Sequence, residues 1–392
     1  MKKLAVLATL CLVSSAHAEK WNPKNNPSLF NIVSKSPMRL DLASLPLAAK
    51  LHDEHIGWSE TYWPAKLGGV AYRWNSPNPQ PFKYKLKTKA ELLKMSEREL
   101  SELSPAELYD VSQGDYGFTL TKRVLAKNAP TDLWWEGICH GWALAASHYP
   151  EPERVTVTNK DGIKVPFGSS DVKGLMSLHD AYNSAGAYAR IGERCDVPGK
   201  VAGEAFPEDG VVPAYTQADA NISRCADVNA GAFHVVITNM IGLNSLGFVA
   251  DVDRFNDIWN QPIVGYESKV IGNVAVTAAE FRNGIASKVR MTNIMTYGEE
   301  LEFYSHELEA EGVIGFVQKD PVTGTQFQTY NSRSYEYILE LDAQNKIVGG
   351  TWISESRPDF LWMKKKDLKF NNGRPFIGFP LEGLNRIYKP RQ

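Results

Sequence analysis

Cys139 is the residue of this chain best suited to act as a nucleophile. Gly137 and Gly141 lie on either side of it, and the helix-forming residues 143–148 follow. A cysteine at the start of a helix lies at the positive end of the helix dipole, which favours the thiolate over the thiol. The sequence therefore predicts nucleophilic chemistry at Cys139; the alternative is a buried thiol that serves only in packing.

The first eighteen residues match a secretory signal peptide. Two lysines precede the apolar residues 4–13, and the small-residue cleavage signal Ala-His-Ala follows at 16–18. The apolar run is shorter than the roughly 20 residues that span a bilayer, and no other stretch is long enough. We therefore expect a secreted or periplasmic protein without a transmembrane segment.

Cleavage of this signal would remove Cys11 and leave Cys139, Cys195 and Cys225. Cys195 and Cys225 both lie in polar sequence rich in loop-forming residues, which favours a disulfide that closes a long loop. Cys139 is then left as an unpaired thiol in an exported protein, which supports a chemical role for it.

Composition limits the protein class only broadly. Removal of residues 1–18 leaves 374 residues with 41 basic and 45 acidic side chains, enough for one large or two medium domains. No clustered basic face indicates a nucleic-acid partner.

The second and third catalytic candidates come from two apolar runs at residues 232–240 and 246–253, which we expect to form a β-hairpin. Antiparallel pairing about the intervening turn would place His234 opposite Asp251, and a register shift of two residues would offer Asp253 instead. A lone histidine in a strand is more often structural, so the pairing alone does not establish a site.

The order of these residues along the chain strengthens the prediction. A cysteine at a helix start, then a histidine, then a carboxylate is the order found in papain-like cysteine enzymes. In that arrangement His234 removes the proton of Cys139, and Asp251 fixes the imidazole tautomer. The amide of Cys139 would stabilise the oxyanion.

The segment Trp-Asn-Gln-Pro-Ile-Val-Gly-Tyr at residues 259–266 resembles the W-N-Q-P-x-x-G-aromatic segment of the elicitor-type transglutaminases. Further segments carry the same resemblance across most of the chain: Cys-His-Gly-Trp-Ala at 139–143, Tyr-Trp-Pro at 62–64, Gly-Gly at 68–69, Leu-Glu-Leu-Asp at 339–342, Gly-Gly-Thr-Trp at 349–352 and Arg-Pro-Asp-Phe-Leu-Trp at 357–362. Val264 departs from the family pattern, which often has a basic residue there.

The resemblance implies a papain-like catalytic core that joins glutamine and lysine side chains through an isopeptide bond. It places the nucleophile on Cys139, the histidine on His234 and the aspartate on Asp251. Calcium support is implied by the family alone: no cofactor is required by the residues, and the spacing of Asp251, Asp253 and Asp257 matches no EF-hand loop.

Three tryptophans are candidates for substrate binding: Trp135, Trp142 and Trp259. An apolar approach that excludes water would favour a lysine amine over water as the acyl acceptor, and indole rings can contact the lysine cation. Core packing is the alternative for each of them.

The surrounding elements indicate an α+β fold: a papain-like core with an antiparallel sheet and a helical amino-terminal layer. Residues 88–113 carry three capping-box patterns that begin short helices, and residues 335–341 and 347–353 form a second predicted hairpin. We divide the chain into a signal peptide (1–18), an extended arm (19–55), an aromatic and helical scaffold layer (56–130) and the catalytic core with its carboxy-terminal sheet (131–392).

Three functions remain at this stage. The first is a secreted protein-glutamine γ-glutamyltransferase acting on Gln- and Lys-bearing proteins or peptides, cell-wall proteins among them. The second is a papain-like protease or peptidoglycan amidohydrolase with the same residues and water as acceptor. The third is a non-enzymatic wall-binding protein whose aromatic side chains contact carbohydrate.

Overall fold

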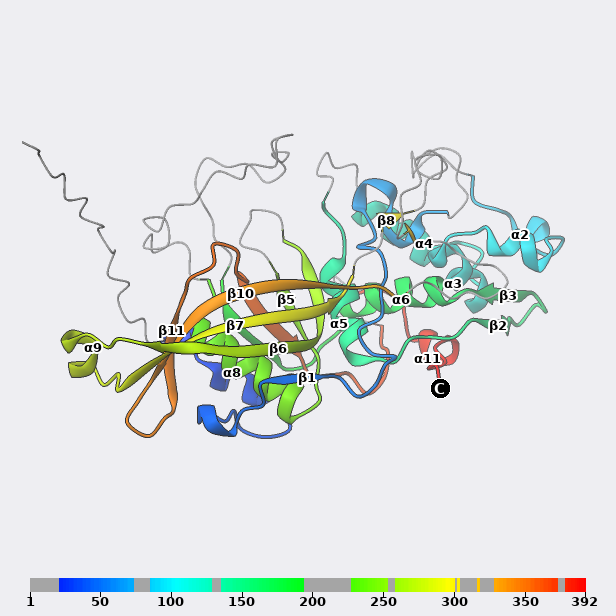
Figure 1. The fold of residues 1–392 in the computed structure, drawn as a ribbon. Helices are drawn as coiled ribbons and strands as arrows, with labels where there is room; N and C mark the ends of the chain where they lie inside the picture. Colours follow the sequence, from blue (N-terminus) through cyan, green and yellow to red (C-terminus); the bar gives the residue numbers. More distant parts are fainter. Residues whose placement is uncertain are drawn as a thin grey trace, which may run out of the picture.

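A curled antiparallel sheet and a group of helices lie side by side in the computed structural model of the chain (Figure 1). The structure describes residues 21–73, 85–128, 135–193, 227–252, 258–299, 302–303, 316–317, 328–372 and 378–392. In these ranges no helix has the length and apolar character needed to cross a membrane.

The large sheet has the strand order β11-β10-β7-β6-β5-β12-β4, and β1 pairs with β6 beside this path. Every pairing in this sheet is antiparallel. Its strands are β1 (Ala48–Lys50), β4 (Tyr188–Gly192), β5 (Phe248–Asp251), β6 (Asn260–Val274), β7 (Ser287–Gly298), β10 (Tyr330–Leu341), β11 (Ile347–Trp352) and β12 (Phe360–Lys364). Two smaller sheets pair β2 (Val155–Thr158) with β3 (Lys164–Phe167) and β8 (Glu302–Phe303) with β9 (Phe316–Val317).

The α-helices gather mostly on the opposite side of the molecule from the long strands (Figure 1). They are α1 (Lys89–Leu92), α2 (Glu97–Ser101), α3 (Pro105–Gln113), α4 (Thr119–Lys127), α5 (Cys139–His148), α6 (Ser169–Tyr182), α8 (Ala230–Ile237), α9 (Ala278–Arg282) and α11 (Leu384–Ile387). Short 3₁₀ helices include η1 (Pro23–Asn25) and η2 (Pro27–Ile32), and a π-helical segment, η6 (Thr238–Leu243), continues α8. This segregation of helices and strands confirms the α+β prediction.

The three predicted capping boxes are present at the starts of α1, α2 and α3. In each, the Ser or Thr side chain accepts a hydrogen bond from the third helical residue, whose glutamate in turn accepts from the cap amide; the cap residues are Thr88, Ser96 and Ser104. Each box satisfies two amides that the helix itself leaves without a partner. Local sequence therefore fixes where these short helices begin.

Two hydrophobic cores meet at α5. One lies among the helices and includes Cys139 and Trp142. The other lies between the large sheet and α8 and includes Ala143 and Leu144. Because one helix supplies residues to both cores, its position is fixed by the helical layer and the sheet together.

The prediction of a β-hairpin from residues 232–240 and 246–253 is wrong in its first half. Residues 230–237 form helix α8, which Asn229 begins by accepting hydrogen bonds from the amides of Gly231 and Ala232. Short apolar runs are ambiguous between a strand and a buried helix, and here the cap and the surrounding core decide. The second run does form a strand, β5, but its partners are β6 and β12.

The carboxy-terminal hairpin is confirmed. β10 and β11 pair antiparallel, with Tyr337 opposite Trp352 and a register shift after Glu340. The turn closes with a hydrogen bond from the amide of Asn345 to the carbonyl of Asp342, and Asn345 adopts a φ of 60°. Asparagine tolerates this left-handed conformation better than most residues.

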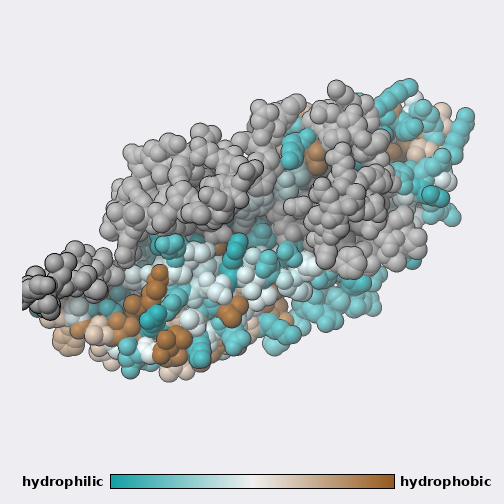
Figure 2. Space-filling view, turned by 45° about the horizontal axis from the view of Figure 1, so that its top comes forward, coloured by the Kyte–Doolittle hydropathy of each residue, from teal (hydrophilic) through white to brown (hydrophobic). Residues whose placement is uncertain are grey.

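Hydrophobic residues are also exposed on the half of the molecule that carries the sheet, as Figure 2 shows. Exposed large side chains in this part include Val270 on β6, Phe281 on α9 and Ile294 on β7.

Candidate active site

Cys139 is the first residue of α5 and lies in the wall of a cavity of about 360 Å³. Its side chain is nearly buried, with 7% of the residue exposed. The cavity is lined by Trp135, Glu136, Gly137, Cys139, His140, Tyr188, Arg190, Ile258, Asn260, Phe360, Trp362 and Lys364. The predicted nucleophile therefore stands at a helix start, as the sequence indicated, and the structure adds the cavity beside it.

The two glycines around Cys139 allow the close packing that sets its position. A Cβ on Gly137 would lie 2.4 Å from the carbonyl oxygen of Tyr62, and one on Gly141 would lie 2.1 Å from the carbonyl oxygen of Ser177 in α6. The amide of Ile138 donates to the same Tyr62 carbonyl at 2.7 Å. Any larger residue at either glycine would move the start of α5.

Two neighbours from the β6 region contact the Cys139 sulfur. Asn260 Nδ2 donates to Sγ at 3.6 Å, and Sγ lies 3.7 Å from the carbonyl oxygen of Ile258, to which the thiol can donate. Trp362 Nε1 donates to Asn260 Oδ1 at 2.7 Å, so the amide is held with its N–H toward the sulfur. An oriented N–H donor of this kind stabilises a thiolate.

Asp251 lies beside Asn260. The two residues are direct partners in the antiparallel pair of β5 and β6, so their side chains share one face of the sheet with Cβ atoms about 5 Å apart. Asp251 is fully buried, and its Oδ1 accepts from the amide of Trp259 at 3.1 Å. The structure therefore brings the predicted carboxylate close to the residue that contacts Cys139.

His234 has a different environment from that expected. It lies on α8 rather than on a strand, is fully buried, and its Nδ1 is 2.7 Å from the hydroxyl oxygen of Tyr337 on β10. Burial lowers the pKa of His234 to about 4, so the ring is neutral near pH 7. Its ring lies 5.8 Å from that of Tyr337, and the neighbouring Phe233 packs against Tyr335, Tyr337 and Trp352.

The surroundings of His234 reach the backbone next to Asp251. Tyr335, whose ring packs on Phe233, donates from its hydroxyl to the carbonyl oxygen of Val252 at 2.9 Å, and Val252 directly follows Asp251. No hydrogen bond in the described ranges joins His234 to Cys139 or Asp251, and the catalytic role of His234 stays a prediction.

The three predicted substrate-binding tryptophans lie in three settings. Trp135 lines the cavity, and its Nε1 is buried without a hydrogen-bond partner in the part of the chain that the structure describes. Trp142 is fully buried and donates from Nε1 to the carbonyl oxygen of Trp58, so it packs the core. Trp259 is partly buried against the helical core, with its ring 5.6 Å from that of Tyr62.

Sequence reasoning named only Cys139 and Trp135 among the residues that line the cavity, and two of those it missed bear on the chemistry. Asn260 stands within the Trp-Asn-Gln-Pro segment that carried the family resemblance, but its contact with sulfur depends on the pairing of β5 and β6. His140 follows Cys139 directly and lines the same cavity. Burial, together with the charges of Lys364 and Lys127, lowers the pKa of His140 to about 4, so this ring is also neutral near pH 7.

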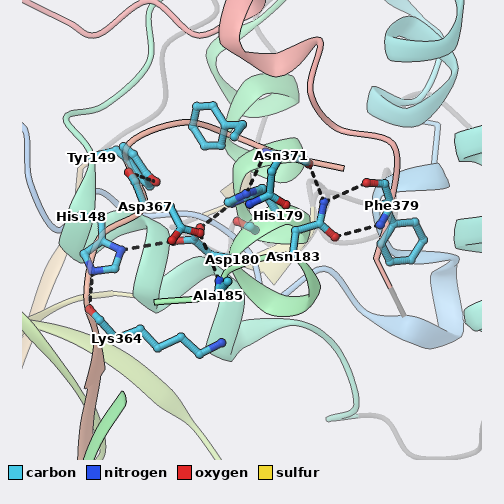
Figure 3. A network of polar contacts seen from close by, with 12 residues as sticks. His148, Tyr149, His179, Asp180, Asn183, Ala185, Lys364, Asp367, Asn371 and Phe379 are labelled. Carbon is cyan, nitrogen blue, oxygen red and sulfur yellow. Dashed lines mark hydrogen bonds and ion pairs between the residues drawn. The ribbon is translucent and has the colours of Figure 1, made fainter. Parts of the chain in front are cut away.

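The far end of α5 is held by a buried polar network (Figure 3). His148, the last residue of α5, and His179 of α6 both place Nδ1 toward the Asp180 carboxylate, at 3.4 and 2.8 Å. His148 Nε2 also lies 2.8 Å from the carbonyl oxygen of Lys364, a residue of the cavity wall. The network thus connects the helix that carries Cys139 to β12.

Asp180 is ionised in this network. Burial alone would raise the pKa of Asp180, but the hydrogen bonds and charges of His148 and His179 outweigh that effect and hold it below its ordinary value.

Several residues of interest lie outside the described ranges. They are residues 1–18 of the predicted signal peptide, Cys195 and Cys225 of the predicted disulfide, and Asp253 and Asp257. Cys139 lies within those ranges and is buried. The same ranges contain no group of three or more His, Cys, Asp or Glu side chains that could hold a metal ion.

The chain was compared with known proteins. A family model described as "Transglutaminase elicitor" matches residues 31–372. The fold is similar to the crystal structure of the GP42 transglutaminase from Phytophthora sojae, with a TM-score of 0.60, 20% sequence identity, and coverage of 94% of this chain and 98% of that chain. No curated protein sequence matches the chain.

Proposed function

From the premise that this chain belongs to the transglutaminase elicitor family, we propose that it is a secreted protein-glutamine γ-glutamyltransferase with Cys139 as its nucleophile. One observation carries the proposal: Cys139, on which the family resemblance places the nucleophile, begins α5 in the wall of a cavity, beside a fixed amide donor.

The proposed reaction has two steps. The Cys139 sulfur attacks the carboxamide carbon of a glutamine side chain, the carbon–nitrogen bond breaks, and ammonia leaves with the proton that the thiol gives up. A lysine amine then attacks the thioester, the carbon–sulfur bond breaks, and the amine proton returns to the thiolate. The products are an isopeptide bond and the free thiol of Cys139.

Three features support thiolate formation. The helix dipole places positive potential at the first residue of α5. Asn260 donates its N–H to the sulfur, and the positive charge of Lys364 lies in the same cavity wall. Each of these stabilises a negative charge on sulfur more than a neutral thiol.

The proton transfers need a carrier between sulfur and the leaving nitrogen. His234 was the candidate from chain order, with Asp251 as its partner. His140 is a second candidate because its neutral ring lines the cavity. Asp251 stays in the proposed site because its carboxylate lies next to Asn260, the residue that contacts the sulfur.

The tetrahedral oxyanion would accept a hydrogen bond from the amide of Cys139. The aromatic walls formed by Trp135, Phe360 and Trp362 would limit water and favour an amine as acceptor.

The decisive experiment is incorporation of a fluorescent primary amine, monodansylcadaverine, into a glutamine-containing protein such as casein. Transfer by the purified mature protein, with release of ammonia, is the expected result. Ammonia release without amine incorporation would identify the hydrolase alternative. Neither product, under conditions in which the chain is folded, would remove the enzymatic proposal.

Calcium dependence is tested in the same assay. The family resemblance leads us to expect less transfer after treatment with EGTA and recovery on addition of calcium. Equal rates in both conditions would show that this chain works without the ion. No step described above passes through calcium.

A further inference from the structure

Charged side chains are distributed unevenly around the cavity. Arg190 on β4 and Lys364 at the end of β12 line the side formed by the sheet, and Glu136 lines the side formed by the loop before Cys139. Among the described residues, a substrate that enters along the sheet therefore meets two cations on that side of the cavity, whereas the carboxylate of Glu136 lies on the other side.

The Arg190 guanidinium is held in place before any substrate arrives. Its Cζ lies 3.9 Å from the centroid of the Phe360 ring, and its Nε donates to the carbonyl oxygen of Gly192 at 3.3 Å. Stacking on an aromatic face and a bond through Nε fix the plane of the group while leaving its outer edge available.

Among the described residues no hydrogen bond or ion pair uses the two terminal nitrogens of Arg190, which form that outer edge. These nitrogens form the fork that binds a carboxylate through two parallel N–H bonds. Arg190 is thus a cation in a fixed orientation in the wall of the Cys139 cavity.

The distance to the sulfur suits a neighbouring residue of the same substrate chain. Asn260, which contacts Sγ, lies on β6, and Arg190 lies on β4, three strand spacings away in the order β6-β5-β12-β4. Three spacings amount to about 14 Å between backbones. An extended peptide covers that span in about four residues, and in fewer once the Arg and Glu side chains reach toward each other.

We infer that Arg190 selects glutamine substrates that carry an acidic residue a few positions from the reactive glutamine. The inference rests on the proposed function and names the substrate class of the same site: an acidic peptide segment. Lys364 contributes long-range attraction, in keeping with its effect on the neighbouring His140 ring. The carboxylate at the end of a peptide has the same chemistry as a Glu side chain. The experiment therefore tests a Glu side chain and a terminal carboxylate in separate peptides.

The experiment compares kcat/KM for monodansylcadaverine transfer to a set of peptides with one glutamine. One series places a single Glu at each position from two to four residues before or after the glutamine, with alanine as the neutral reference. A second series has only neutral side chains and ends in either a free carboxylate or an amide. We expect one Glu position to exceed the reference by about tenfold, since a charge-assisted bond is worth more than 1 kcal/mol.

Substitution of Arg190 then tests the residue. Arg190→Gln should reduce the preference for the acidic peptide to less than about twofold, and Arg190→Glu should reverse it toward a peptide with Arg at the same position. This reversal cannot arise from a structural role for Arg190. Arg123 on α4 is exposed and is not among the residues that line the cavity, so Arg123→Gln is the matched control and should retain the wild-type preference.

The outcomes distinguish this inference from the proposed function. Transfer to all peptides at equal rates would overturn the inference and leave the transferase. A preference that Arg190→Gln and Arg190→Glu leave unchanged would also overturn it. A preference for the free peptide terminus alone would replace the acidic side chain with a terminal carboxylate as the group recognised. No transfer to any peptide or to casein would remove the proposed function itself.

Discussion

The two ends of α5 have opposite polar environments. At its start, Cys139 faces a cavity and accepts a hydrogen bond from the oriented amide of Asn260. At its end, His148 is buried and hydrogen-bonded on both ring nitrogens, to Asp180 and to the backbone of Lys364. One end is accessible to a reactant and the other is closed by the protein's own groups.

The difference shows how a rigid helix can present a reactive group. A nucleophile needs space for a substrate and donors that gain strength as charge develops. The cavity at the start of α5 removes packing contacts from that end of the helix. The buried network at the far end holds the helix in position. Reactivity and rigidity are therefore separated along one ten-residue helix.

The largest expected effect comes from removing the reactive group at the open end. Cys139→Ala should lower amine incorporation by about 10⁴-fold or more, because no other group can form the thioester. The thermal midpoint should change little, since the residue lies at the cavity wall. Activity retained in this variant would contradict the assignment of the nucleophile.

Disrupting the closed end should instead reduce stability. Asp180→Asn should lower the free energy of unfolding by about 3 kcal/mol, because it removes the charge that two buried histidines share. Urea unfolding measures this effect, and amine incorporation per folded molecule should stay near the wild-type value. A large loss of specific activity with unchanged stability would assign Asp180 to the chemistry rather than to the scaffold.

The pH dependence of stability offers a second test of the closed end. The pKa of Asp180 is lower in the native state than in the unfolded chain, so its contribution is complete above the unfolded value of about 3.9 and is lost as pH falls through the native value. Wild-type protein should therefore lose more stability than Asp180→Asn on acidification below about pH 4.

His140 in the cavity wall and His234 in an aromatic core, both neutral near pH 7, offer a further test of which parts of the molecule take part in the chemistry. His140→Gln should lower kcat/KM by about 100-fold if the cavity histidine carries the proton, as its position favours. His234→Gln should mainly lower stability, because it breaks the bond to Tyr337 within an aromatic core. The reverse pattern, measured by transfer rate and urea unfolding together, would restore His234 as the proton carrier.

The smallest expected effect concerns the amide beside the sulfur. Asn260→Ala should reduce the rate of iodoacetamide labelling at Cys139 by about tenfold at pH 7, since one hydrogen bond to the thiolate is lost. Gln261→Ala on the same strand is the matched control. Equal labelling rates in both variants would mean that the helix start alone stabilises the thiolate.

Local rules in the sequence were sufficient for much of the scaffold. The three helices predicted from the capping patterns begin at Thr88, Ser96 and Ser104. The turn at Asn345 joins the two strands of the predicted carboxy-terminal hairpin. These features depend on hydrogen bonds between residues a few positions apart, so the neighbouring sequence contains all the information they need.

The error at residues 232–240 has a clear physical origin. The run is apolar on all sides, so neither a two-residue nor a 3.6-residue period distinguishes its conformation. Burial against β10 and β11, together with the Asn229 cap, selects the helix. Once that run is helical, the expected side-by-side arrangement of His234 and Asp251 on paired strands no longer exists.

By itself, the sequence determined the chemical character of Cys139: two glycines allow the backbone to approach closely, and the residues that follow favour a helix whose dipole acts on the sulfur. Only the tertiary structure decided what surrounds that sulfur. Asn260, Arg190 and Trp362 come from strands distant in the sequence, and sheet pairing over long separations brings them to one cavity. A local interaction can be predicted from neighbouring residues, whereas a site assembled across strands depends on the packing of the whole core.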